Sequence, residues 1–231
     1  MHIAFLLFPG VTQLDLTGPA QFLSRLPDAR VDLVWESRDP VPTDAGFAIL
    51  PTATFGEVPR ADLLCVPGGM GIAGVIDHAP ALDWVRQVGT AAQWVTSVCT
   101  GALVLGAAGL LKGYQATTHW AWHDKLALFG AEPVHARHVI DRNRATGGGV
   151  TAGIDFALAL MARIAGEDHA RAVQLALEYD PAPPFDAGSP AKAGEDLVEV
   201  YTQRARRLAP TRMDDLLASA RRLGFVTEGQ E

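Results

Sequence analysis

The sequence contains little cysteine, no excess of positive charge and no long apolar segment. Only two of its 231 residues are cysteines, Cys65 and Cys99, too few for the disulfide framework of a secreted protein of this size. The formal net charge of −7 argues against a nucleic-acid partner, because nucleic-acid-binding surfaces are basic. The longest apolar runs are broken by Gly, Asp or Arg, so none predicts a membrane-spanning helix. We therefore expect a cytoplasmic protein that binds neither nucleic acid nor membranes.

Strand-like and helix-like segments alternate along the chain, and 48% of the residues are apolar. Strands are expected over residues 2–8, 31–36, 46–50, 61–66 and 93–98 and twice within 134–146, and helices after Pro80, after Gly101, over 151–165 and over 167–178. This order predicts an α/β fold in which helices cover both faces of a mostly parallel sheet. The first helix is expected to begin near Pro19 with Thr17 as its N-cap.

A proline-rich segment, PAPPFDAGSP at residues 181–190, separates the C-terminal part of the chain from the rest. Two helices with several arginines are expected after it. Acidic residues are interspersed among these arginines, which favours a solvated helix face over a binding surface. We expect residues 1–180 to form one α/β domain. Residues 181–231 would be a connector and C-terminal helices packed on that same domain.

Cys99 lies at the junction of an apolar strand and a helix rich in small residues. The sequence Val98-Cys99-Thr100-Gly101 predicts a sharp turn that presents the thiol at the carboxyl edge of the sheet, as a nucleophile elbow does. The N-terminus of the following helix would favour the thiolate. A buried structural cysteine is the alternative. Cys65 lies inside an uninterrupted apolar strand and is expected in the core.

Two further segments contribute groups to the same edge of the predicted sheet. Asp15 follows the first strand, in a loop, between two leucines, and such a carboxylate must be solvated in a cleft or hydrogen-bonded. A role in the loop or in a helix cap is the alternative. Gly68 and Gly69 follow the strand that contains Cys65, and their missing side chains allow backbone N–H groups to face a ligand. Many glycine turns have no such function.

His119 and His123 have the i, i+4 spacing of a metal pair on a helix. No glutamate lies between them, and no third ligand is evident in the sequence. We therefore expect neither a metal nor an organic cofactor.

Taken together, these segments resemble the ThiJ/PfpI (class I glutamine amidotransferase-like) superfamily, and within it the isocyanide-hydrating members. The resemblance is carried by FLLFPGVTQLDLTGP, CVPGGMG, VTSVCTGALVLGAAGLLKG, ATTHWAWH, TGGGVTAGIDFAL and LEYDPAPPFDAGSP. It implies a flavodoxin-like α/β fold with Cys99 as nucleophile and Asp15 as acid/base. It also implies a hydroxyl and backbone donor at Thr100, a backbone donor at Gly69, and pocket residues at His119 and Trp120. For His119 a catalytic base is the alternative, as in the cysteine–histidine pairs of the superfamily's proteases and amidotransferases.

The reaction that this resemblance implies is the addition of water to an isocyanide, which yields an N-substituted formamide through a thioimidate on Cys99. The enzyme would be a cofactor-independent lyase, and the resemblance implies a homodimer. Three alternatives remain open: an aldehyde-processing enzyme acting on glyoxal-type substrates, a regulatory domain like those of AraC-type transcription factors, and a thiol redox sensor. The chain after the connector is too short for the tandem DNA-binding motifs of such regulators.

Overall fold

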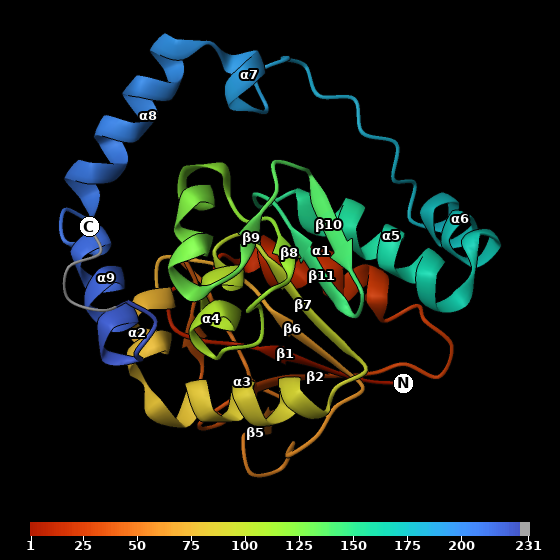
Figure 1. The fold of residues 1–231 in the computed structure, drawn as a ribbon. Coiled ribbons are helices and arrows are strands. Elements are labelled where there is room, and N and C mark those ends of the chain that lie inside the picture. Colours follow the sequence, from red (N-terminus) through yellow and green to blue (C-terminus); the bar gives the residue numbers. More distant parts are fainter. Residues whose placement is uncertain (227–231) are drawn as a thin grey trace.

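A seven-stranded sheet covered by helices forms the centre of the computed structural model, which describes residues 1–226 (Figure 1). In spatial order the strands are β10 (His138–Asp141), β11 (Arg144–Gly147), β7 (Trp94–Val98), β6 (Leu63–Val66), β1 (His2–Leu6), β2 (Arg30–Trp35) and β5 (Ala53–Thr54). Neighbouring strands are parallel except β10 and β11, which are antiparallel. The mostly parallel sheet predicted from the sequence is confirmed.

The central strands are buried on both faces, which explains why their sequences are apolar without alternation. All four residues of β6 are buried, and so are all residues of β1 after His2. In register, Cys65 of β6 lies between Phe5 of β1 and Thr96 of β7. Cys65 has no exposed surface, and burial raises the pKa of its thiol to about 12. Its predicted place in the core is confirmed.

Two layers of helices cover the sheet. Helices α1 (Gln13–Leu23), α5 (Ala152–Ala165) and α6 (Glu167–Ala176) pack in one layer, and α2 (Ile72–Asp77), α3 (Ala79–Ala91) and α4 (Gly101–Ala107) in the other. The step from β1 to β2 and the step from β6 to β7 run in opposite directions across the sheet, so right-handed crossovers place α1 and α3 on opposite faces. The 3₁₀ helix η1 (Trp120–Phe129) packs against α4.

Four short strands form two small sheets beside the main one. Strands β3 (Val41–Pro42) and β4 (Ala48–Ile49) pair antiparallel, and β8 (Gln115–Ala116) and β9 (Glu132–Pro133) pair parallel. Within residues 1–226, no helix is both long and apolar enough to cross a membrane.

After α6 the chain leaves the α/β body and forms an arm (Figure 1). The arm contains the short α7 (Pro190–Ala193) and α8 (Glu195–Leu208), which has no buried residue. Helix α9 (Arg212–Arg222) returns to the body and packs on α2, where the Ser219 hydroxyl donates to Asp77 Oδ1 (2.8 Å). The two expected C-terminal helices are therefore α8 and α9, and α7 is an additional turn.

The start of the first helix differs from the prediction. Helix α1 begins at Gln13 with Thr12 at the N-cap position, and Pro19 lies inside it. The Thr17 hydroxyl is no cap, because it donates to the Gln13 carbonyl one turn earlier (3.0 Å). Proline has no N–H, so the carbonyl of Asp15 lacks its helical partner. Asp15 is thus in the first turns of a helix and not in the loop before it.

Candidate active site

Cys99 lies between β7 and α4, at the carboxyl edge of the sheet, and the predicted strand-to-helix turn is present. Its φ of 55° is left-handed, a conformation that costs a non-glycine residue on the order of 1–3 kcal/mol. The Cys99 N–H donates to the carbonyls of Gly147 (3.0 Å) and Gly148 (2.8 Å). The Thr118 hydroxyl donates to the Cys99 carbonyl (2.7 Å). These hydrogen bonds stabilise the strained turn.

Two glycines allow the chain segments around this turn to approach one another. A Cβ at Gly101 would collide with the carbonyl oxygen of Val66 at the end of β6. A Cβ at Gly68 would lie 2.6 Å from the backbone nitrogen of Thr100 and 2.8 Å from Asp15 Oδ2. Real Cβ atoms do not approach that closely. The end of β6, the start of α4 and the Asp15 carboxyl therefore meet at one point.

Asp15 is fully buried beside Cys99. Its Oδ2 accepts a hydrogen bond from the Gly68 N–H (2.9 Å), and Oδ1 has no hydrogen-bond partner among the described residues. Burial raises the pKa of the carboxyl to about 7, although the Gly68 N–H and the Cys99 thiol lower it. A carboxyl that titrates near neutral pH can both donate and accept a proton there.

The Cys99 side chain is 6% exposed. Burial raises the pKa of its thiol and the charge of Asp15 raises it further, while the N–H groups of Thr100 and Val150 lower it. The Thr100 N–H at the N-terminus of α4 favours the thiolate, but desolvation outweighs this contribution, so the pKa of the thiol is raised. Because the charge of Asp15 raises the pKa of the Cys99 thiol, and the thiol lowers the pKa of Asp15, the two groups titrate as a coupled pair.

Thr100 and Gly69 are hydrogen-bonded to each other. The Gly69 N–H donates to the Thr100 hydroxyl oxygen (3.1 Å), and the Thr100 N–H interacts with the Cys99 sulfur. Gly69 has a φ of 147°, and its carbonyl accepts a hydrogen bond from Arg212 (3.0 Å). The Gly69 N–H is thus available to a ligand only where the ligand replaces the Thr100 hydroxyl.

His119 and Trp120 lie at the start of η1 and form an aromatic cluster with Tyr201 of α8. The ring centroids of Trp120 and Tyr201 are 5.0 Å apart, and those of His119 and Tyr201 are 6.2 Å apart. Burial lowers the pKa of His119, and the charge of Arg212 lowers it further. Burial raises the pKa of Tyr201, and a negative charge on Cys99 raises it further. The aromatic cluster is therefore close to the candidate nucleophile.

A pocket of about 290 Å³ opens next to this aromatic cluster. Trp120 and Tyr201 line it together with residues of the arm, Ala187, Gly188, Ser189, Pro190, Ala193, Leu197 and Val198. Neither Cys99 nor Asp15 lines this pocket. The arm therefore covers the outer side of the aromatic cluster, and the pocket between them does not include Cys99 or Asp15.

Arg212 is a residue near the site that the sequence reasoning missed. It is the first residue of α9, and it donates to the Gly69 carbonyl and to Met70 Sδ (3.1 Å). Its guanidinium lies over the Trp122 ring at 4.7 Å, and the Cys99 charge raises its pKa, although burial lowers it more. The expectation of a solvated arginine face is wrong for this side chain. No local signal distinguishes it, since only the return of α9 brings it to the site.

The histidine pair at residues 119 and 123 does not form a metal site. Side chains four residues apart on a 3₁₀ helix point about 120° away from each other, because this helix has three residues per turn. His119 also precedes η1 and accepts a hydrogen bond from the Ala121 N–H on its Nδ1 (3.3 Å). In the described part of the chain, the group of side chains suited to a metal is His123, Asp124 and His135.

Comparisons with known proteins agree with this architecture. The isonitrile hydratase of Pseudomonas putida is 54% identical over 205 residues, which are 89% of this chain and 90% of that protein. A crystal structure of a ThiJ/PfpI family protein from Pseudomonas syringae superposes with a TM-score of 0.87 at 46% identity, covering 95% of this chain and 90% of the other. The transcriptional regulator GbdR of Pseudomonas aeruginosa is 33% identical over 58% of this chain, but only 37% of the regulator is covered. The DJ-1/PfpI family model matches residues 1–163, and the chain belongs to this family.

Proposed function

We propose that this protein is an isocyanide hydratase, a lyase that converts an isocyanide and water to an N-substituted formamide. One structural observation carries the proposal: a fully buried carboxyl, Asp15, whose pKa is raised to about 7, lies beside the Cys99 thiol. The similarity to the isonitrile hydratase of Pseudomonas putida supports the choice of substrate. The two cysteines are unpaired, which suits a cytoplasmic enzyme.

In the first half-reaction, Cys99 adds to the terminal carbon of the isocyanide. Asp15 as carboxylate takes the thiol proton while the sulfur forms its bond to carbon. Asp15 then delivers this proton to the same carbon, whose lone pair accepts it. The product is a thioimidate in which the former isocyanide carbon carries one hydrogen and is bonded to sulfur and nitrogen.

In the second half-reaction, water replaces the sulfur. Asp15, again a carboxylate, removes a proton from water as the oxygen attacks the thioimidate carbon. The tetrahedral intermediate collapses, the carbon–sulfur bond breaks, and the sulfur regains its proton. Asp15 passes the proton taken from water to the nitrogen, the new hydroxyl loses its proton to the departing sulfur as the carbonyl forms, and the N-substituted formamide is released. These steps require neither a metal nor an organic cofactor.

The other predicted site residues support this chemistry. The N–H groups of Thr100 and Val150 lower the pKa of Cys99, so they stabilise negative charge on sulfur when it attacks and when it leaves. Gly69 contributes by orienting the Thr100 hydroxyl. We assign His119 and Trp120 to the pocket wall, because they pack in the aromatic cluster with Tyr201.

We further propose that the enzyme is a homodimer in which the arm lies on a second copy. The arm exposes large apolar side chains: Phe185 is 80% exposed, Leu197 51%, Val200 61% and Leu208 70%. Leu197, Val200 and Leu208 lie on α8, which has no buried residue, and such a row of exposed apolar side chains favours a protein partner. Sedimentation at micromolar concentration should give the dimer mass, and Val200→Asp with Leu208→Asp should shift it toward the monomer. A wild-type monomer would contradict the proposal.

The proposed activity is tested by incubating the purified protein with an alkyl isocyanide and measuring the formamide by mass spectrometry. The wild type should form product and Cys99→Ala should not. Glyoxal serves as the competing substrate, since an aldehyde-processing enzyme would also use a cysteine and a carboxyl. Turnover of glyoxal without turnover of the isocyanide would replace this proposal with the aldehyde-processing alternative.

A further inference from the structure

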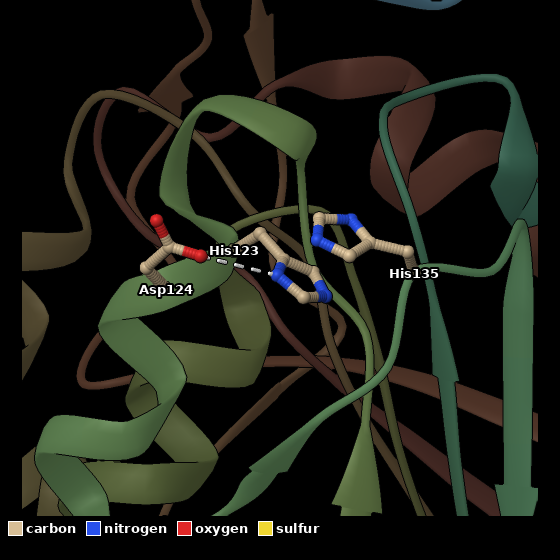
Figure 2. Close-up of side chains that lie close together, drawn as sticks. All are labelled: His123, Asp124 and His135. Atoms are coloured by element: carbon tan, nitrogen blue, oxygen red, sulfur yellow. Dashed lines mark ion pairs between the residues drawn. The ribbon is translucent and has the colours of Figure 1, made fainter.

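Two histidines and an aspartate meet at a point that the proposed reaction does not use. His123 and Asp124 are neighbours in η1, and His135 lies between β9 and β10. Figure 2 shows the His135 ring over the His123 ring, with the Asp124 carboxylate beside the pair. One ligand atom from each of the three residues lies within 4.8 Å of the other two.

The environment of the His123 side chain also points to a ligand. It is only 5% exposed, yet neither of its ring nitrogens has a hydrogen-bond partner among the described residues. Its Nδ1 lies 3.5 Å from Asp124 Oδ1, which is longer than a normal hydrogen bond. A buried polar group without a hydrogen-bond partner destabilises the folded state, so such a group calls for a ligand.

The distances fit a metal ion. Bonds of about 2.0–2.1 Å around tetrahedral zinc place neighbouring ligand atoms about 3.4 Å apart. The Nδ1 of His123 and Oδ1 of Asp124 are already 3.5 Å apart. The His135 ring is stacked on the His123 ring, with centroids 3.5 Å apart and planes at 15°. Because His135 is exposed, its ring can rotate out of the stack and bring a nitrogen toward the other two ligand atoms.

We propose that His123, Asp124 and His135 bind a divalent transition-metal ion, with zinc as the first candidate. Two imidazoles and one carboxylate suit zinc and its neighbours in the first transition row, whereas calcium and magnesium prefer oxygen ligands. Water completes the coordination on the exposed side. The ion would connect η1 to the segment before β10 and thereby stabilise the helix that carries Trp120.

The test measures zinc binding directly, by calorimetric titration of the metal-free protein. The titration uses the Cys99→Ala background, so that the thiol of the candidate active site does not bind the ion. We expect saturable binding of one equivalent of zinc. Titration with Co²⁺ should produce the visible absorption of a cobalt ion with nitrogen ligands.

Two ligands are exposed, so they can be changed without opening a cavity in the core. His135→Asn and Asp124→Asn, each in the Cys99→Ala background, should weaken zinc binding by at least about tenfold. His169→Asn is the matched control, because His169 is a partly exposed histidine of α6 whose Nε2 contacts the Arg25 carbonyl instead. The absence of saturable binding would overturn the proposal. So would binding that survives both ligand variants, or that His169→Asn weakens equally.

Discussion

Replacing Asp15 with asparagine should slow the reaction and at the same time remove a pH-dependent loss of stability. The buried carboxyl has a pKa of about 7 in the folded protein, against about 3.9 for an aspartate in an unfolded chain. Between these two values the folded state binds more protons than the unfolded state, so stability falls as pH rises. Above pH 7, ionising the buried carboxyl lowers the free energy of unfolding by about 4 kcal/mol in total. About 2–3 kcal/mol of this loss develops between pH 5 and pH 8.

The assay is urea denaturation of the wild type and Asp15→Asn at pH 5 and pH 8. Asparagine does not titrate, so the wild type should lose about 2–3 kcal/mol more than the variant over this interval. Because each protein is compared with itself at the two pH values, any pH-independent change in stability caused by the new amide group cancels. The variant should also lose activity by a factor on the order of 10²–10⁴, since it can neither deliver nor accept a proton. An equal pH dependence of stability in the two proteins would refute the assignment of a raised pKa to Asp15.

Three further substitutions test the neighbouring groups. Gly68→Ala should abolish activity, because its Cβ would lie 2.8 Å from Asp15 Oδ2, whereas Gly74→Ala, at a position with open space, should leave turnover unchanged. Cys65→Ala should remain active and lose about 1–2 kcal/mol of stability to a small cavity, measured by denaturation; an inactive but folded variant would contradict its core role. Arg212→Met should slow alkylation of the Cys99 thiol by iodoacetamide, because the attraction between the guanidinium and the Cys99 thiolate is removed. An unchanged alkylation rate would show that this arginine has no electrostatic role at the site.

The central strands β1 and β6 could be predicted because their sequences lie in short apolar runs that end at a proline and a glycine. Strand β6 is an example, since the apolar sequence LLCV stops at Pro67 and Gly68. The start of α1 could not be predicted in this way, because proline is favoured in the first turn of a helix and here lies in its interior. Burial of the helix against α5 outweighs the lost hydrogen bond at Pro19.

The proximity of Cys99 and Asp15 could be predicted from the sequence, but the surroundings of these two residues could not. Cys99 and Asp15 follow strands whose carboxyl ends meet at one edge of the sheet, which is a property of the topology. Arg212 and Tyr201 reach the site only because the arm and α9 fold back over η1. The direction of the Cys99 pKa shift depends on how deeply the thiol is buried, and local sequence does not report that depth.

Trapping the covalent intermediate would show directly whether Cys99 is the nucleophile. The enzyme is mixed with an alkyl isocyanide, quenched during turnover, and analysed by intact mass and peptide mapping. We expect a mass increase equal to that of the isocyanide, located on the peptide that contains Cys99 and formed before the formamide appears. Formation of formamide with no adduct at Cys99 and an undiminished rate in Cys99→Ala would contradict this expectation.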